Sequence, residues 1–287
     1  MTVRDALREG AAALAGTETP FLDASLLLAD ALSADAARLL ASGPETMEEG
    51  ALELYRAGIA SRSRGSPVAY ILGRKEFWGR VFAVDERVLV PRPDTETLVA
   101  AALEVGDSIA GGRPLRVHEA CCGSGCVAIS LAAERPDWQV SASDASAPAL
   151  DVARANAGAL LAPGRPGGAL SLARSDLLSS VRGTFDLLVA NPPYVPSAEA
   201  EALLALGWSE PRMALDGGSD GLDLIRRLVP EAVLALASGG ALLVEADGEQ
   251  AEEVARLFHD SRLTDIEVRL DIGGKARVTS GRKPWKT

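Results

Sequence analysis

Apolar residues recur at helical spacing through the first 70 residues of the chain. Leu22, Leu26 and Leu27 fall on one face of a helix, and Leu52 and Ile59 repeat the spacing further on. Breaks rich in glycine, serine, threonine and proline separate these stretches at residues 16–20, 33–35 and 42–44. The pattern predicts a small unit of four or five short helices, in which no residue has catalytic character.

The apolar period changes to two between residues 77 and 91. FWGRVFAV and RVLVPR both alternate apolar and polar residues, and Asp85 and Glu86 lie between them. Alternation on both sides of a short polar turn predicts a β-hairpin. Pro91 and Pro93 should end it, and a helix is expected to restart with Thr95 as its N-cap.

From residue 115 onward, short apolar strands alternate with amphipathic helices. Such units form a parallel sheet that is covered by helices on both faces, so the predicted fold class is α/β. No helix separates the last two strands, and the sheet should therefore end in an antiparallel pair. Strands are expected at 115–120, 138–143, 169–174, 185–190, 241–246, 266–270 and 276–280, with helices from Val127 and over 147–158, 222–237 and 249–258.

Composition limits the cellular setting and the partners. The 287-residue chain carries a formal net charge of −11, which disfavours nucleic acid as the main partner because duplex binding needs a basic face. Its start has no signal-peptide core, and no apolar run is long enough to span a bilayer. The three cysteines lie within six residues and cannot form a disulfide framework. We therefore expect a cytoplasmic monomer that has no membrane partner.

The first stretch with chemical character is EACCGSGC, residues 119–126, which follows one predicted strand and opens a helix. Gly123 and Gly125 let the backbone pass close beneath a ligand, and the helix N-terminus offers amide donors. Asp144 ends the next strand, where an acid can accept both hydroxyls of a ribose. The pattern indicates a nucleoside-containing cofactor. It also fits a dinucleotide site, or an ordinary tight turn with Asp144 as a helix cap.

A metal site is not expected in this stretch. His118, Cys121, Cys122 and Cys126 span a strand end, a loop and a helix start, and no CxxC pair supports ligation. The cysteines are interpreted as small apolar fillers beneath the loop.

RSDLL, residues 174–178, follows the third predicted strand of the sheet. Asp176 suits the amino group of an adenine, and Leu177 suits its ring. A helix cap formed by Asp176 fits this stretch equally well.

NPPY, residues 191–194, stands at the carboxyl end of the strand 185–190. Two prolines stiffen the backbone, so the Asn191 amide oxygen and the Pro192 carbonyl become fixed acceptors beside the flat wall of Tyr194. Two fixed acceptors suit a planar NH2 group, either an amide or an aromatic amine. They would hold its nitrogen in line with an electrophilic methyl group, with no need for a strong base. The alternative is a simple strand-end turn with a packed tyrosine.

Together these stretches resemble the PrmC/HemK family of peptide chain release factor glutamine N5-methyltransferases. The resemblance implies a Rossmann-like class I S-adenosylmethionine-dependent methyltransferase domain (94–287), a helical substrate-recognition domain (1–73) and a connecting β-hairpin (74–93). It extends from about residue 65 to the end, through SPVAYILGRKEFWG, VLVPRPDTETLV, CGSGCVAISLA, SDAS, RSDLL, NPPYVP, EPRMALDGGSDGLDLIRRL and RVTSGR.

The resemblance also implies roles for individual residues. The substrate would be the glutamine of the GGQ motif of class-1 release factors, bound by Asn191, Pro192, Pro193 and Tyr194, with Asn191, Pro192 and Tyr194 catalytic. The cofactor S-adenosyl-L-methionine would contact Cys121, Cys122, Gly123, Ser124, Gly125, Asp144, Asp176, Leu177 and Asn191.

The chain departs from the family pattern in one place. Cys121 stands where the family has a glycine, which narrows the backbone freedom of the loop.

Other functions fit parts of the sequence. VDERVLVPR and CxGSGC are also similar to the sister enzymes that methylate a glutamine of ribosomal protein L3, although PDTE (93–96) and the basic ending favour the release-factor branch. NPPY suits an adenine-N6 nucleic-acid methyltransferase, but the chain is acidic. GSGCVA allows an NAD(P)-dependent oxidoreductase, which leaves NPPY without a role. A binding module that has lost donor affinity is a further alternative.

Overall fold

The computed structural model describes residues 1–285, apart from the side chains of residues 36, 37 and 40. The last two residues of the predicted 94–287 domain therefore lie outside it. The described chain forms two compact units, each with its own core. One comprises Met1–Arg74 and Leu203–Ser209, and the other comprises Lys75–Ala202 and the chain from Glu210 onward. No described helix combines the length and the apolar composition that crossing a bilayer requires.

The first unit is helical, as its apolar spacing predicts. Its core packs Tyr55 against Gly10, and the Tyr55 hydroxyl donates to the carbonyl oxygen of Ala6 over 3.1 Å. Asp23, which is buried in this unit, pairs with Arg62 at 2.6 Å. The helices are α1 (Val3–Ala13), α2 (Pro20–Ala31), α3 (Ala36–Ala41), α4 (Glu49–Ser63) and α5 (Val68–Leu72).

The β-hairpin is present, but its predicted turn was wrong. β1 (Arg74–Phe77) and β2 (Arg80–Ala83) pair with each other, and the chain turns at Trp78 and Gly79. Both turn residues have positive φ, the geometry that two-residue hairpin loops favour.

The segment RVLVPR, predicted as the second strand, is not a strand. Val84, Val88 and Val90 are buried, so their alternation reflects packing against the core. The backbone N–H of Val90 donates to the Glu210 carboxylate over 2.7 Å instead of to a neighbouring strand.

The second unit is built on one seven-stranded sheet. Its strand order is β5-β4-β3-β6-β7-β9-β8, with β9 antiparallel to both of its neighbours and the other pairings parallel. The predicted α/β class with an antiparallel ending is confirmed. The strands are β3 (Arg116–Ala120), β4 (Gln139–Asp144), β5 (Ser171–Arg174), β6 (Phe185–Ala190), β7 (Leu236–Glu245), β8 (Thr264–Leu270) and β9 (Ala276–Arg282).

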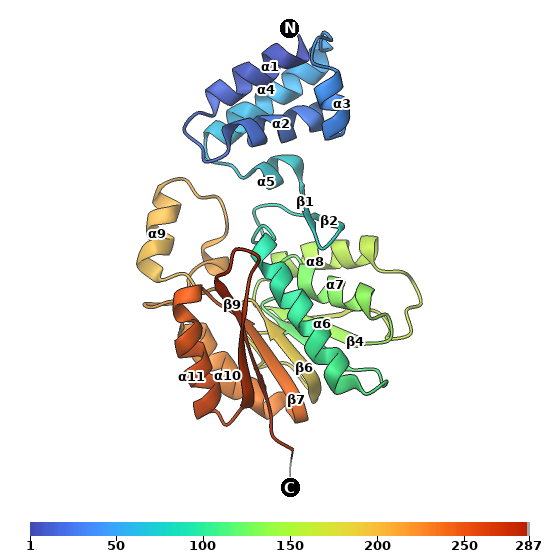
Figure 1. Ribbon diagram of the computed structural model, residues 1–287, viewed down its shortest axis with the longest axis vertical. Helices are drawn as coiled ribbons and strands as arrows, with labels where there is room; N and C mark the ends of the chain where they lie inside the picture. Colours follow the sequence, from blue (N-terminus) through green and yellow to red (C-terminus); the bar gives the residue numbers. More distant parts are fainter. Residues whose placement is uncertain (286–287) are drawn as a thin grey trace. The chain divides into compact units, whose positions relative to one another are not determined.

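Helices cover both faces of this sheet (Figure 1). On β6, Leu187 and Val189 face the core under α6, α7 and α8, whereas Leu188 and Ala190 face the core under α10 and α11. Alternate residues of one strand thus fill two separate cores. The helices are α6 (Glu96–Ala110), α7 (Cys126–Glu134), α8 (Ala147–Leu160), α9 (Ser197–Ala205, absent from the predicted elements), α10 (Asp223–Ala235) and α11 (Ala251–Asp260).

A buried asparagine on α8 fastens the hairpin to the loop that follows β3. The Asn156 amide nitrogen donates to the carbonyl oxygens of Ala83 and Ser124, both at 3.0 Å, and its oxygen accepts from the Ala83 N–H over 2.8 Å. The side chain therefore satisfies three backbone groups at once.

We expect Asn156→Ala to lower the free energy of unfolding by about 2–4 kcal/mol, because it leaves these three groups without their partner. Urea unfolding followed by tryptophan fluorescence measures the loss. The control Asp151→Ala removes an exposed side chain of the same helix and should change stability by less than about 0.5 kcal/mol. A loss of similar size in both variants would contradict the role of Asn156.

Candidate active site

Three polar residues and a cysteine form a row along the carboxyl edge of the sheet. Ala120 of β3 is in register with Ser143 of β4 and with Ala190 of β6, and Ala190 is in register with Val244 of β7. The next residue of each strand therefore stands at the same level. These four residues are Asp144, Cys121, Asn191 and Glu245.

A cavity of about 520 Å³ opens along this edge. Its lining comes from segments that are far apart in the sequence: the loop after β3, the ends of β4 and β6, the chain after β5, and residues 86–95. A volume of this size accommodates a ligand of cofactor dimensions. Of the predicted cofactor residues, the lining includes Cys121, Cys122, Gly123, Ser124, Asp144, Asp176, Leu177 and Asn191.

The loop after β3 adopts a left-handed backbone three times. Cys121, Gly123 and Gly125 have φ of 59°, 50° and 79°. Glycine tolerates this conformation, whereas a side chain costs about 1–2 kcal/mol there. The departure of Cys121 from the family pattern therefore falls on a strained position.

Asp144 holds this loop through its carboxylate. One oxygen accepts from the Gly123 N–H and the other from the Ser146 N–H, both at 2.8 Å. Burial raises the pKa of Asp144, and these backbone donors oppose the rise. The acid thus lines the cavity and closes the loop at the same time.

A second buried acid, Glu119, lies behind the loop. Its carboxylate accepts from the Ala128 N–H in the first turn of α7 over 2.8 Å. Burial raises the pKa of Glu119 to about 8, and the nearby Asp144 adds to the rise. Two carboxyl groups therefore lie on one side of the cavity, where they favour ligands that carry hydroxyl groups.

Cys121 and Cys122 are part of this loop, and Cys126 begins α7. Cys122 and Cys126 are buried in the core under α6–α8, and Cys121 is half-buried against the other core. Burial raises the pKa of all three thiols, so they remain protonated and weakly nucleophilic at neutral pH. The part of the chain that the structure describes holds no cluster of three His, Cys, Asp or Glu side chains placed to bind a metal ion.

Asp176 and Leu177 lie beside one another on the cavity wall after β5. Leu177 is buried and has a φ of 49°, a second strained position at this edge. Asp176 is mostly exposed and pairs with Arg227 of α10 at 2.6 Å. The pair presents an apolar surface next to a carboxylate.

The NPPY residues differ in their access to the cavity. Asn191 and Pro193 line it, whereas Pro192 is buried and Tyr194 is half-buried outside the lining. Burial raises the pKa of Tyr194 to about 12, so its hydroxyl stays protonated.

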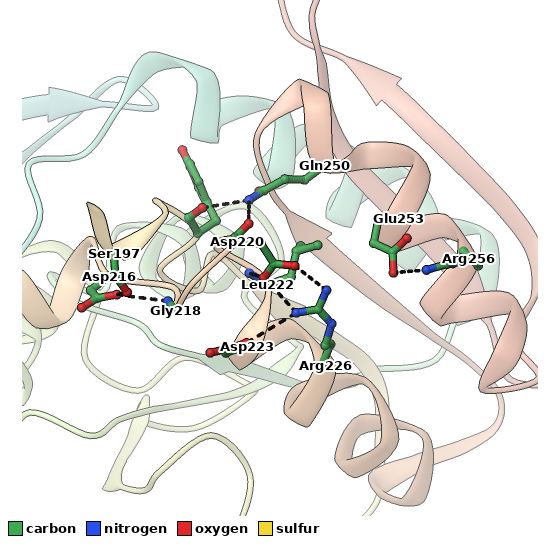
Figure 2. A network of polar contacts seen from close by, with 11 residues as sticks. Ser197, Asp216, Gly218, Asp220, Leu222, Asp223, Arg226, Gln250, Glu253 and Arg256 are labelled. Atoms are coloured by element: carbon green, nitrogen blue, oxygen red, sulfur yellow. Dashed lines mark hydrogen bonds and ion pairs between the residues drawn. The ribbon is translucent and has the colours of Figure 1, made fainter. Parts of the chain in front are cut away.

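The backbone after NPPY is held by a glycine-rich loop, residues 216–221. Gln250 donates to the carbonyl oxygens of Tyr194 and Asp220 at 2.9 and 3.1 Å, and Figure 2 shows it reaching across to this loop. A Cβ atom on Gly221 would lie 2.0 Å from the Tyr194 carbonyl oxygen. Only glycine permits so close an approach.

The Asn191 side chain is tethered through its nitrogen. Its amide nitrogen donates to the Thr95 hydroxyl over 3.2 Å, and that hydroxyl donates to Glu245 over 3.0 Å. No donor in the described chain reaches the Asn191 amide oxygen or the Pro192 carbonyl oxygen. Thr95 is the N-cap residue of α6, as predicted, but its hydroxyl makes no capping hydrogen bond and bonds to these side chains instead.

Sequence reasoning did not single out Glu245 or Glu210 as site residues. Glu245 is buried, and its burial raises its pKa to about 7 against the lowering effects of the Thr95 hydroxyl and of Arg277. Glu210 is also buried. It binds the segment before α6 by accepting from the Val90 N–H and by an ion pair with Arg92. The one signal in the sequence that could have pointed to Glu245 was an acidic residue at the end of a predicted apolar strand.

Comparison with known proteins shows which proteins the chain is similar to. Residues 5–73 match the model of the PrmC N-terminal domain, and residues 111–206 match that of the methyltransferase small domain. A release factor glutamine methyltransferase of Bradyrhizobium diazoefficiens is 39% identical over 91% of this chain and 88% of its own. One from Burkholderia pseudomallei is 40% identical over 92% of each chain.

A solved structure supports the fold of the second unit. A methyltransferase from Pyrococcus furiosus superimposes with a TM-score of 0.52 at 16% identity, covering 72% of this chain and 91% of its own. The expected Rossmann-like methyltransferase fold is thereby confirmed.

We expect Cys121→Gly to be more stable than Cys121→Ala by about 1 kcal/mol, because only glycine relieves the left-handed strain. Thermal unfolding of the two variants measures the difference. At the preceding residue, Ala120→Gly should instead destabilise by about 1 kcal/mol, since a strand residue gains nothing from glycine. Equal stability of the two Cys121 variants would show that the strain is absent.

Proposed function

The chain belongs to the release factor glutamine methyltransferase family, and we propose that it methylates N5 of the glutamine in the GGQ motif of class-1 peptide chain release factors. Like other members of this family it uses S-adenosylmethionine as the methyl donor. The proposal rests on one observation: the Asn191 carboxamide is tethered by its nitrogen, so its oxygen is available as an acceptor at the cavity.

The residues along the cavity fit this donor. S-adenosylmethionine supplies an electrophilic methyl group, and it carries ribose hydroxyls, an adenine ring and positive charge. Asp144 and Glu119 place two carboxyl groups beside the glycine loop, which suits the ribose hydroxyls. Leu177 and Asp176 offer an apolar surface and an acceptor, which suit an adenine. We assign the donor to these residues and to the backbone of Cys121–Gly125.

The substrate amide is the group that NPPY would hold. A carboxamide nitrogen is a weak nucleophile because its lone pair is delocalised into the carbonyl. Acceptance of its two N–H bonds by the Asn191 oxygen and the Pro192 carbonyl orients the nitrogen and favours lone-pair density on it as it becomes tetrahedral. The nitrogen would then take the methyl group from the sulfonium sulfur, which leaves as the thioether of S-adenosylhomocysteine. The methylated nitrogen would release its proton to water, so no strong base is needed.

We expect Asn191→Ala to lower methyl transfer to a purified release factor about 10²–10³-fold, because one of the two oriented acceptors is lost. Transfer of tritium from labelled S-adenosylmethionine measures the rate. The unfolding temperature should remain close to that of the native enzyme. The Kd of S-adenosylhomocysteine, measured by calorimetry, should rise far less than the transfer rate falls. Ribosomal protein L3 and a release factor with its GGQ glutamine replaced by alanine are the substrate controls. Labelling of L3 in preference to the release factor would overturn the substrate assignment.

We further assign recognition of the release factor to the helical unit. A three-residue motif offers too little surface for selectivity, so binding energy must come from elsewhere on the substrate protein. Phe21, Leu22 and Leu26 of α2 are exposed large apolar side chains in this unit, and such patches are typical of protein contacts.

Deletion of residues 1–70 should lower kcat/KM for the release factor at least 100-fold, since most of the docking surface is lost. Tritium transfer measures this, while S-adenosylhomocysteine binding reports whether the remaining unit is folded. Full-rate methylation by a truncated enzyme that binds S-adenosylhomocysteine would refute the role of the helical unit.

A further inference from the structure

We propose that Thr95 and Glu245 are positioning residues that set the orientation of the Asn191 carboxamide. The inference deepens the proposed function and rests on it for the meaning of Asn191 in catalysis. Its evidence is a chain of two hydrogen bonds that joins three distant segments: the start of α6, the end of β6 and the end of β7.

The donor and acceptor roles in these two hydrogen bonds follow from the chemistry of the three side chains. The Thr95 hydroxyl donates its single proton to the Glu245 carboxylate. An ionised carboxylate can only accept hydrogen bonds, so this direction is fixed at a pH above the raised pKa of Glu245, which is about 7. The Thr95 oxygen must then accept from its other neighbour. Asn191 satisfies it only with its NH2 end turned inward, which leaves the amide oxygen on the cavity side. The carboxylate thus decides, through the hydroxyl, which end of the carboxamide a substrate meets.

The burial of Glu245 indicates that its hydrogen bond to Thr95 does not serve to stabilise the folded state. The residue is 1% exposed, and no hydrogen-bond partner in the described chain reaches its second carboxylate oxygen. Burying such a group costs free energy that an apolar residue of similar size would not. Arg277 on β9 and Asp94 before α6 are charged groups that act on Glu245 electrostatically, and Arg277 pairs with Asp94 and Asp271. An orienting role explains why an acid occupies this place.

The alternation of side chains along β6 and β7 brings Asn191, Glu245 and Thr95 together. Leu187 and Val189 of β6 and Ala241 and Leu243 of β7 all face the core under α6. Asn191 and Glu245 continue these alternations, so both side chains point to the face on which α6 begins. Thr95 stands at that helix start, where the two side chains meet it.

Nuclear magnetic resonance can test the orientation directly, because the chain contains only two asparagines, Asn156 and Asn191. Asparagine-selective 15N labelling therefore gives two side-chain NH2 signals, assigned with Asn191→Ala. In Thr95→Val we expect the Asn191 signal to shift and its hydrogen exchange to accelerate at least tenfold, whereas the Asn156 signal should stay unchanged. Thr95→Ser keeps the hydroxyl and should restore the native signal.

Turnover supplies the second readout. Thr95→Val should lower kcat on the release factor about tenfold or more, with the Kd of S-adenosylhomocysteine changed less than twofold, and Thr95→Ser should stay within threefold of native kcat. Glu245→Leu should lower kcat similarly without lowering the unfolding temperature, because it also removes a buried charge. Thr279→Val, the same change at a buried threonine of β9, should leave both readouts unaltered.

The outcomes separate the two proposals. An Asn191 signal that is unmoved in Thr95→Val overturns the positioning role. The Asn191 signal could instead respond in Thr95→Val while the native enzyme transfers no methyl group to the release factor. That pair of results would support the positioning role and overturn the proposed substrate. A kcat that falls only in step with the unfolding temperature also contradicts positioning, since it marks a purely structural role.

Discussion

The register of four neighbouring parallel strands is the constraint on which the site depends. Because Ser143, Ala120, Ala190 and Val244 are aligned, the chain leaves the sheet at one level on all four strands, and their next residues share one edge. A slip of one residue on any strand would turn its edge residue to the opposite face of the sheet. The two hydrophobic cores, which take alternate residues of β6 and β7, therefore fix the geometry of the cavity as well as the stability of the fold.

A few residues at the carboxyl edge of the sheet adopt conformations or positions that are unfavourable in free energy. Cys121 and Leu177 hold left-handed backbone conformations that disfavour a side chain, and Glu119 and Glu245 are acids in buried positions whose pKa values are raised to about 8 and about 7. Strain and buried polar groups of this kind persist only where the surrounding structure enforces them. Their gathering at one edge of the sheet, between two apolar cores, is the physical signature of a site selected for function.

Much of the fold and part of the site could be predicted from the sequence. Strand 185–190 was located to the residue, since a short apolar run between turn residues has few alternatives. Glycine and proline marked the loop 121–125 and the NPPY segment, because each restricts or frees the backbone in a way that does not depend on distant partners. The hairpin turn was misplaced because the alternation at Val84, Val88 and Val90 reports burial, and burial does not require a strand partner.

The sequence by itself determined the α/β pattern, the stiff segment after β6 and the glycine loop after β3, all of which follow from local periodicity and backbone restriction. Only the tertiary structure decided that the Thr95 hydroxyl bonds to Glu245, 150 positions away, instead of capping its own helix, and that Glu210 binds the segment before α6. The physical reason is that a polar side chain has several partners of similar energy, and the choice among them depends on which distant groups the packed sheet brings within about 3 Å.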